Sequence, residues 1–236
     1  MSKPATNLRP DNSGTADAQP RTLVFIAYPQ MGLLDLTGAQ TVFWAATKAL
    51  IECGLPGYAL RTASLEGGPI QTAEGLVIDT EKLSDLNDVQ IDTLITPGTP
   101  HIRLVMADCV PLVDWLRVAS LRARRTASVC SGTCLLALAG LLDGRRAATH
   151  WVVADLFESL FPWVQLDRDA IFVKHDSVWT SAGVSAGIDL ALAMVEADCG
   201  LDVSLQVARR LVVFYRRPDN QEQWRPQLHS QQQAIA

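Results

Sequence analysis

Short apolar runs of strand length alternate along this chain with longer segments suited to helices. The first run, residues 22–28, is continuously apolar, which is typical of a strand covered on both faces of a sheet. Further strands are expected at residues 58–64, 93–96 and 126–129, as a pair within 171–180, and in a hairpin that ends near residue 78. Parallel strands need crossover connections, which are usually helices. The alternation therefore predicts an α/β fold, a doubly wound three-layer sandwich with a mostly parallel sheet and helices on both faces.

Helices are expected near residues 36–53, 109–122, 134–142, 151–160, 185–197 and 201–215. A chain of 236 residues, 48% hydrophobic and 19% charged, can form one soluble domain with a substantial core. We assign this domain to residues 21–215. Residues 1–20 are polar and rich in Pro, Asn, Ser and Gly, so a disordered leader is expected there. The polar, Gln-rich residues 216–236 are expected to form a linker-like tail.

The charge and hydropathy of the chain argue against two classes of partner. The net charge of −5 does not suggest a broad nucleic-acid surface, so no direct nucleic-acid binding is expected. The basic cluster of Arg122, Arg124 and Arg125 is interpreted as the solvated end of a helix. No apolar run approaches the roughly 18 residues that span a bilayer, so no membrane association is expected.

The five cysteines are odd in number and widely scattered. This pattern argues against a disulfide framework and favours a reducing, cytoplasmic setting. Cys130 and Cys134 have no matching Cys or His pair nearby, so no metal site is expected, and no cofactor either. Four cysteines are interpreted as small buried hydrophobic residues: Cys53, Cys109, Cys134 and Cys199.

Cys130 is the main candidate for chemistry. It follows the expected strand at residues 126–129 and precedes Ser131, Gly132 and an apolar helix. A strand, one nucleophilic side chain, small residues and then a helix is the layout of a nucleophile elbow. The positive end of the helix would favour thiolate over thiol, so a low pKa and ready oxidation of Cys130 are expected.

Asp35 and Gly98 follow other expected strands and should lie at the same edge of the sheet as Cys130, where ligands bind in such folds. Asp35 is surrounded by apolar residues. Partial desolvation there would raise the pKa of its carboxyl group and let it share a proton with Cys130. Asp35 could equally cap the following helix. The spacing alone leaves these two readings open.

Other residues are candidates for the same site. The backbone amides of Gly98 and Ser131 could donate to a developing negative charge. Gly183 and Val184, in a small-residue loop before a helix, could line the pocket or form only a tight turn. His150 and its neighbour Thr149 could also line it, although the sequence favours a helix-start or core role for His150. His101 and His175 are expected at the surface.

Four segments resemble the ThiJ/PfpI superfamily: LLDLTG at residues 33–38, TPG at 96–98, ASVCSGTCLLALAGLLDGRRAATHW at 127–151 and TSAGVSAGIDLAL at 180–192. The resemblance covers roughly residues 22–224. It implies a flavodoxin-like fold related to class I glutamine amidotransferases, a small-molecule ligand or substrate, and a homodimer that pairs through helices near the elbow.

Two branches of the superfamily share these motifs. In isocyanide hydratases, which convert isocyanides to N-substituted formamides, an acid faces the elbow cysteine; by resemblance these residues are Asp35 and Cys130. Those enzymes have Thr after the nucleophile, where this chain has Ser131. In AraC-type transcription regulators, an amidotransferase-like half precedes a DNA-binding half, and residues 208–224 resemble the linker between them. This chain has Asp219-Asn220 where that linker usually has Gly-Gly, and Trp224 where it has Phe.

The sequence therefore supports two functions. The linker-like segment favours a small-molecule-sensing domain of the regulator type that lacks the DNA-binding half with its helix-turn-helix units. The Asp35–Cys130 pair favours a cysteine-dependent hydratase or hydrolase. On the sequence alone we rank the sensing domain first, because of the linker-like segment.

Overall fold

The structure, a computed structural model, describes residues 19–214. Apart from residues 19 and 20, the predicted leader lies outside this range, as does the predicted tail at 216–236.

A sheet of eight strands forms the centre of the molecule, in the order β3-β4-β2-β1-β5-β6-β10-β9. The strands are β1 (Arg21–Ile26), β2 (Tyr58–Ser64), β3 (Gly68–Gln71), β4 (Val77–Lys82), β5 (Thr93–Thr96), β6 (Arg125–Val129), β9 (Phe172–His175) and β10 (Val178–Ser181). Every pair from β4 to β10 is parallel, and only the two edge pairs are antiparallel. The predicted mostly parallel sheet is confirmed. Two short strands, β7 (Arg146–Ala147) and β8 (Gln165–Leu166), pair separately.

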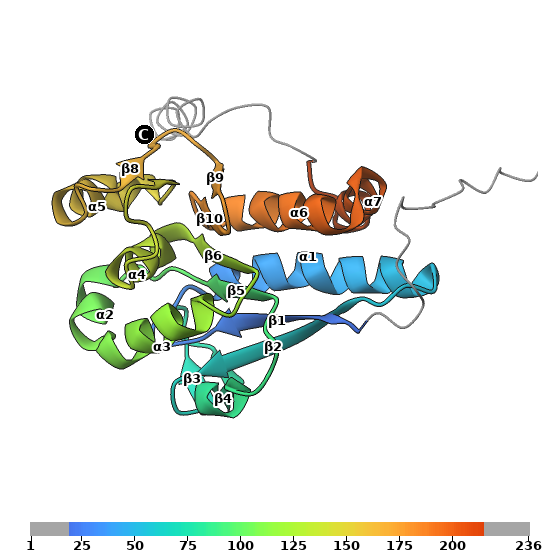
Figure 1. The fold of residues 1–236 in the computed structure, drawn as a ribbon, viewed down its shortest axis with the longest axis horizontal. Coiled ribbons are helices and arrows are strands. Elements are labelled where there is room, and N and C mark those ends of the chain that lie inside the picture. Colours follow the sequence, from blue (N-terminus) through green and yellow to red (C-terminus); the bar gives the residue numbers. More distant parts are fainter. Residues whose placement is uncertain (1–18, 215–236) are drawn as a thin grey trace, which may run out of the picture.

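The helices lie in two groups around the sheet (Figure 1). They are α1 (Leu33–Glu52), α2 (Ile102–Asp108), α3 (Val110–Ser120), α4 (Thr133–Leu138), α5 (Ala154–Leu160), α6 (Ala186–Cys199) and α7 (Leu201–Leu211), with 3-10 turns η1 (Leu83–Leu86), η2 (Cys130–Gly132) and η3 (Trp151–Val153). α1, α6 and α7 pack against one another, and α4 packs against α2 and α3. The chain moves from β1 to β2 in one direction and from β5 to β6 in the other, so right-handed crossovers place these groups on opposite faces.

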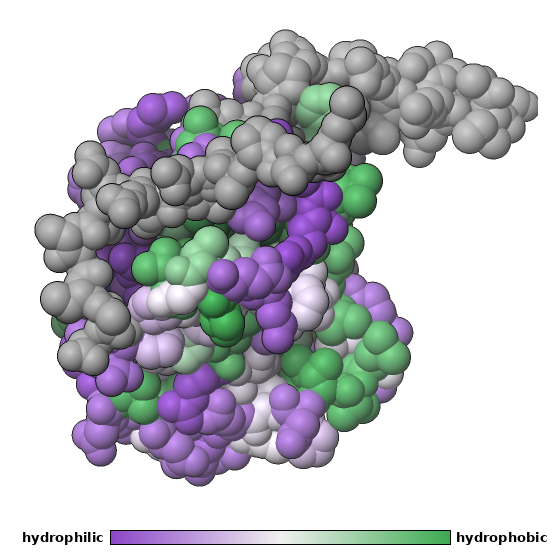
Figure 2. All heavy atoms as spheres, turned by 90° about the vertical axis from the view of Figure 1, so that its right-hand side faces the viewer, coloured by the Kyte–Doolittle hydropathy of each residue, from purple (hydrophilic) through white to green (hydrophobic). Residues whose placement is uncertain are grey.

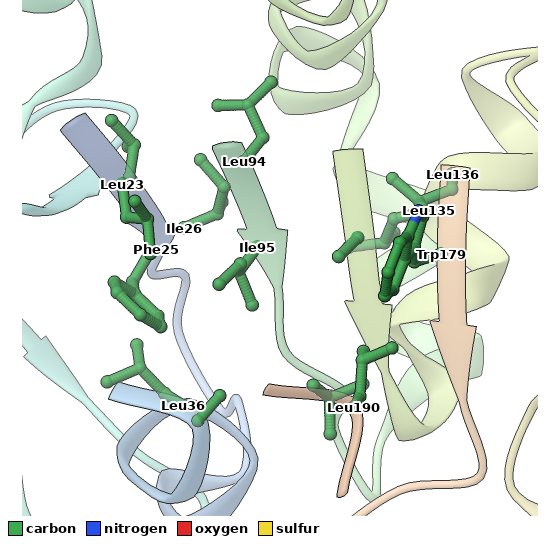
Figure 3. Packing of buried hydrophobic residues seen from close by; sticks show 14 of the residues in the cluster. Leu23, Phe25, Ile26, Leu36, Leu94, Ile95, Leu135, Leu136, Trp179 and Leu190 are labelled. Carbon is green, nitrogen blue, oxygen red and sulfur yellow. The ribbon is translucent and has the colours of Figure 1, made fainter. Parts of the chain in front are cut away.

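The centre of the sheet is buried on both faces, as the apolar runs predict. All side chains from Leu23 to Ile26 in β1 are fully buried. Figure 3 shows Phe25 of β1 beside Leu36 of α1, and the Phe25 ring also meets Phe43 edge-on at 6.3 Å. The carboxyl ends of β1, β5 and β6 are thereby held as a rigid edge from which the loops of the candidate site begin.

Three predicted helices differ from the observed ones. The helix expected at residues 109–122 is preceded by α2, and Pro111 stands at the start of α3, where a missing amide proton costs little. α4 is shorter than expected and ends at Leu138. α7 ends at Leu211 instead of residue 215, because Val212 adopts a left-handed conformation with φ 54°.

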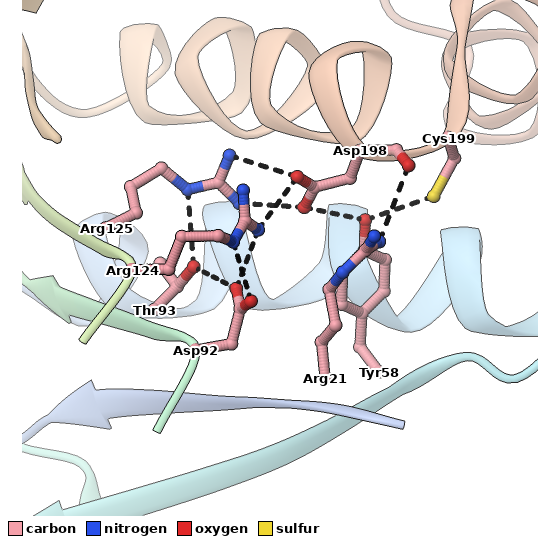
Figure 4. A network of polar contacts seen from close by, with 8 residues as sticks. All are labelled: Arg21, Tyr58, Asp92, Thr93, Arg124, Arg125, Asp198 and Cys199. Carbon is pink, nitrogen blue, oxygen red and sulfur yellow. Dashed lines mark hydrogen bonds and ion pairs between the residues drawn. The ribbon is translucent and has the colours of Figure 1, made fainter. Parts of the chain in front are cut away.

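The prediction of a solvated helix end is wrong for Arg125; Arg122 and Arg124 are exposed and follow the end of α3 at Ser120. Arg125 opens β6, its side chain is only 3% exposed, and its guanidinium lies 2.8 Å from the carboxylate of Asp198 in α6. Arg124 pairs with the same carboxylate at 2.9 Å and with Asp92 at 2.8 Å. Figure 4 shows this ion network between the start of the strands and the end of α6. The prediction considered only neighbours along the chain, and Asp198, the carboxylate that buries Arg125, is distant in sequence.

Two of the four cysteines interpreted as buried hydrophobic residues are buried, namely Cys109 and Cys134. Cys199 is partly buried and lies 3.3 Å from the Tyr58 hydroxyl. Cys53 is exposed, because it directly follows the last turn of α1. All five cysteines are free.

The face that carries α7 and the end of α1 mixes hydrophilic and hydrophobic side chains (Figure 2). Within residues 19–214, none of the helices combines the length and the hydropathy needed to cross a bilayer.

Candidate functional site

Cys130 lies at a sharp turn between β6 and α4. β6 ends at Val129, Cys130 has a positive φ of 60°, and the single 3-10 turn η2 leads into α4. Non-glycine residues rarely adopt positive φ, and such strained positions gather at functional sites. The backbone therefore has the geometry of a nucleophile elbow.

Two threonine hydroxyls hold the backbone of this elbow. Thr149 donates from Oγ1 to the carbonyl oxygen of Cys130 at 3.1 Å, and Thr133 Oγ1 lies 3.2 Å from the same oxygen. Thr133 Oγ1 also lies 2.8 Å from Ser128 Oγ in β6. Thr149, expected beside the thiol, thus contacts Cys130 through its carbonyl oxygen and helps to keep the strained turn in place.

Asp35 lies in the first turn of α1, but it does not cap that helix. One carboxylate oxygen accepts the Gly98 amide at 3.1 Å, and the other accepts the Val184 amide at 2.9 Å. The first amide of α1, from Leu33, donates instead to Glu74. Asp35 is 5% exposed. Of the two readings left open by the sequence, the structure favours the buried acid over the helix cap.

The thiol of Cys130 and the carboxyl group of Asp35 lie close enough that each shifts the pKa of the other. Two glycines make this approach possible. A Cβ on Gly98 would lie 2.7 Å from Cys130 Cβ and 2.8 Å from Asp35 Oδ2, and a Cβ on Gly183 would lie 2.7 Å from the sulfur. Gly183 also has φ 110°, which side chains rarely tolerate. The predicted small-residue loop therefore packs directly against the thiol.

The pKa of Asp35 is raised from its ordinary value, mainly because its carboxyl group is buried. The two backbone amides and the thiol act in the opposite direction, since they stabilise the carboxylate, while the charge of Glu74 raises the pKa further. This direction agrees with the expectation of a desolvated acid.

Cys130 departs from the expectation of a low thiol pKa. Burial raises the pKa of Cys130 well above its ordinary value, and the negative charge of Asp35 raises it further. Hydrogen bonds from Ser131 lower it, but they do not compensate. α4 has only six residues, so its dipole adds little. In the resting site the thiol is protonated, and thiol and carboxyl titrate as one coupled pair.

The two amides expected as oxyanion donors are already engaged. The Gly98 amide donates to Asp35, and the Ser131 amide lowers the pKa of the Cys130 thiol. The Ser131 hydroxyl accepts the Thr99 amide and donates to the Thr99 carbonyl, both at 2.8 Å. In this arrangement both amides orient the pair itself.

Two of the three histidines within residues 19–214, His150 and His175, make side-chain hydrogen bonds. His150 precedes η3 and its Nδ1 accepts the Val152 amide at 3.3 Å, which is the helix-start role favoured by the sequence. Burial lowers the pKa of His150. His101 is exposed, as expected. His175 is half-buried, and its Nδ1 accepts the Arg146 amide at 3.0 Å.

The sequence reasoning missed two residues beside the pair. Tyr28, which follows β1, is buried and donates to the Pro97 carbonyl at 2.6 Å. Glu74 lies between β3 and β4 and reaches the start of α1. Tyr28 could have been found from its position at the carboxyl end of a central strand. Glu74 gave no signal, since a polar residue is ordinary in a hairpin loop.

Comparisons with known proteins agree with this architecture. The model of the DJ-1/PfpI family matches residues 21–197. Isonitrile hydratase from Pseudomonas putida is 31% identical over 188 residues, which are 79% of this chain and 76% of that enzyme. The HTH-type transcriptional regulator CdhR from Pseudomonas aeruginosa is 29% identical over 167 residues, 70% of this chain, so the chain spans about half (48%) of that regulator. The crystal structure of a THiJ/PfpI family protein from Pseudomonas syringae superposes with a TM-score of 0.73 at 24% identity, covering 91% of this chain and 84% of the other.

Proposed function

This chain belongs to the DJ-1/PfpI family, and we propose that it is a cysteine-dependent hydratase that converts an isonitrile to an N-substituted formamide. The observation that carries the proposal is the close approach of the Asp35 and Cys130 side chains at the elbow, both of which lie against Gly98. The match to isonitrile hydratase over three quarters of that enzyme's length supports it. On this support we rank the hydratase first, whereas the linker-like segment alone favours the sensing domain.

The reaction uses the single proton shared by the pair. The Cys130 sulfur forms a bond to the terminal carbon of R–N≡C, and the shared proton moves to that carbon, which gives a thioimidate, R–N=CH–S–Cys130. Asp35 is now a carboxylate, and it takes a proton from a water molecule while the oxygen of that water bonds to the same carbon. The nitrogen becomes N–H by receiving that proton. The C–S bond then breaks, R–NH–CHO leaves, and the remaining proton returns to the pair.

Ser131 preserves the polar group that the hydratases place after the nucleophile. Its hydroxyl hydrogen-bonds the backbone of Thr99 in both directions, a contact that requires the oxygen and not the extra methyl group of Thr. The departure from Thr therefore leaves the support of the elbow intact and does not argue against the proposal.

Turnover of phenyl isonitrile tests the proposed function. The wild-type chain should form N-phenylformamide, measured by chromatography, and Cys130→Ala and Asp35→Asn should each lower the rate by at least about 10²-fold, the range in which an acid–base group contributes. Cys53→Ala is the matched control, because Cys53 is an exposed thiol outside the site. Formamide production by the wild type no faster than by Cys130→Ala would remove the hydratase proposal.

The second candidate is a small-molecule-sensing domain of the regulator type. The match to a transcriptional regulator and the linker-like residues 208–224 favour it, although residues 215–224 lie outside the described range. A sensing domain should be stabilised by its ligand without turnover. In a thermal-shift screen of small molecules, this function predicts an increase in Tm that Cys130→Ala retains.

The proposal includes a reducing compartment such as the cytoplasm, and a homodimer. All five cysteines are free, which fits a compartment that keeps thiols reduced. Sedimentation of the purified chain, whose mass is 25.7 kDa, tests the dimer: a single species of monomer mass at micromolar concentration would contradict it.

A further inference from the structure

The hairpin of β3 and β4 holds the loop that leads into the helix of Asp35. The Gln30 amide donates to the Gln71 carbonyl, and the Ala73 amide donates to the Met31 carbonyl, both at 2.9 Å. The Gly32 amide donates to the Gly98 carbonyl at 2.8 Å. The loop is therefore fastened on one side to the hairpin and on the other to the segment that carries the Gly98 amide.

Glu74 continues this series of contacts onto the helix itself. Its two carboxylate oxygens lie 3.1 and 3.0 Å from the amide nitrogen of Leu33, the first residue of α1. Gly32, which precedes the helix, has no side chain to cap it. Asp35 follows two residues after Leu33. A side chain from the hairpin thus supplies the cap for the turn of α1 that carries the acid.

We propose that Glu74 is a positioning residue for the Asp35–Cys130 pair: its carboxylate caps the helix that carries Asp35 and places a fixed negative charge beside the acid. The inference deepens the proposed function, but it concerns the proton shared by the pair and does not require a particular substrate.

Three ionisable groups face Asp35 from other elements. Cys130 comes from the elbow, Tyr28 from the end of β1, and Glu74 from the hairpin. Tyr28 is neutral, because burial raises its pKa well above the ordinary value. With Cys130 protonated as well, Glu74 is the one of these groups that presents a permanent charge to Asp35. That charge disfavours the Asp35 carboxylate, and so favours the form in which the acid holds the proton and the sulfur is the thiolate.

The rate of Cys130 alkylation by iodoacetamide, followed by mass spectrometry across pH, measures this effect. Glu74→Gln keeps an acceptor for the Leu33 amide and removes the charge. We expect the acid limb of the profile to move down by a few tenths of a pH unit and the neutral-pH rate to fall roughly two-fold, since less thiolate is present. Because Glu74 is exposed, 1 M salt should largely abolish the difference from wild type. Glu74→Ala also loses the cap, so a difference should persist in salt.

Glu66→Gln is the matched control. It removes one exposed carboxylate near the same hairpin, where Glu66 pairs with Lys82 and not with α1; its profile should coincide with wild type. If the Glu74→Gln profile also coincides with wild type at low salt, the inference is wrong. Titration of the Asp35 carboxyl group by NMR gives a second readout that does not depend on thiol accessibility: Glu74→Gln should lower its pKa, and an unchanged pKa would contradict the inference. Absence of isonitrile turnover with the shift present would remove the proposed function alone.

Discussion

Two buried aspartates lie at opposite edges of the same sheet, and their surroundings differ in one respect. Asp198, with a side chain 1% exposed, meets the guanidinium groups of Arg124 and Arg125 where the strands begin. Asp35, 5% exposed, lies where the strands end and meets two backbone amides and a thiol. Asp198 has cations as partners. No cation is among the partners of Asp35 within the part of the chain that the structure describes.

The difference separates a structural carboxylate from the one that the proposed function makes reactive. A carboxylate buried between cations holds elements together through its ion pairs, because removing one partner would leave a buried charge uncompensated. A carboxylate buried against amides and a thiol is stabilised less, so its proton affinity rises and the proton can pass to a neighbour. In this molecule the first arrangement ties β6 to α6, and the second joins α1 to the elbow.

The largest expected effect is on the structural side. Asp198→Ala should lower the free energy of unfolding by about 3–5 kcal/mol, since it leaves the guanidinium of Arg125 buried without its carboxylate. Urea unfolding followed by circular dichroism measures this loss. Asp202→Ala, in the exposed first turn of α7, is the control and should change stability far less. A loss below about 1 kcal/mol for Asp198→Ala would mean that the network does not support the fold.

Gly183→Ala should lower the free energy of unfolding by more than backbone strain alone explains, and it should also change the reactivity of Cys130. The new Cβ would lie 2.5 Å from Cys130 Cβ and 2.7 Å from the sulfur, at φ 110°. Gly200→Ala is the matched control, because Gly200 has φ 86° with no atom within 4 Å of the added Cβ. The control should lose about 1–3 kcal/mol of stability; Gly183→Ala should lose more and also change the rate of Cys130 alkylation. Equal losses and equal rates would indicate that Gly183 does not pack on the thiol.

Asp35 and Asp92, which lie at the two ends of the strands, should contribute to the pH dependence of stability with opposite signs. The raised pKa of Asp35 means that the folded chain binds its proton more tightly, so stability falls as pH rises above the unfolded value of 3.8. Burial raises the pKa of Asp92, but hydrogen bonds from Arg124 and Thr93 lower it overall, so stability is lost as pH falls below 3.8. Relative to wild type, Asp35→Asn should therefore gain stability as pH rises, and Asp92→Asn should lose it. Urea unfolding from pH 3 to 7 measures both; slopes of the same sign would contradict the comparison.

Much of the reactive edge could be predicted from sequence, because its determinants are local. The apolar runs fix the parallel strands, and the residues after β1, β5 and β6 must then meet at one edge. The small residues around Cys130 indicate the sharp turn, whose φ of 60° the structure shows. The composition of the loop of Gly183 and Val184 allows it to line the site but equally allows a simple tight turn.

The remaining features depend on distant partners. The burial of Arg125 follows from Asp198, which is 73 residues away. The raised pKa of Cys130 follows from burial and from Asp35, and the helix-dipole argument, which uses only neighbouring residues, gave the wrong direction. The contact of Glu74 with Leu33 spans 41 residues and depends on the position of a hairpin. None of these contacts leaves a periodic pattern in the chain.

The pKa of the Asp35 carboxyl group tests the central claim most directly. It can be measured by 13C NMR of chain labelled at the aspartate side-chain carboxyl carbons, with Asp35→Asn to assign the signal. The account predicts a pKa above 3.8 in the wild type and a still higher pKa in Cys130→Ala, because the thiol that stabilises the carboxylate is lost. A pKa at or below 3.8 that Cys130→Ala leaves unchanged would contradict a proton shared between the two side chains.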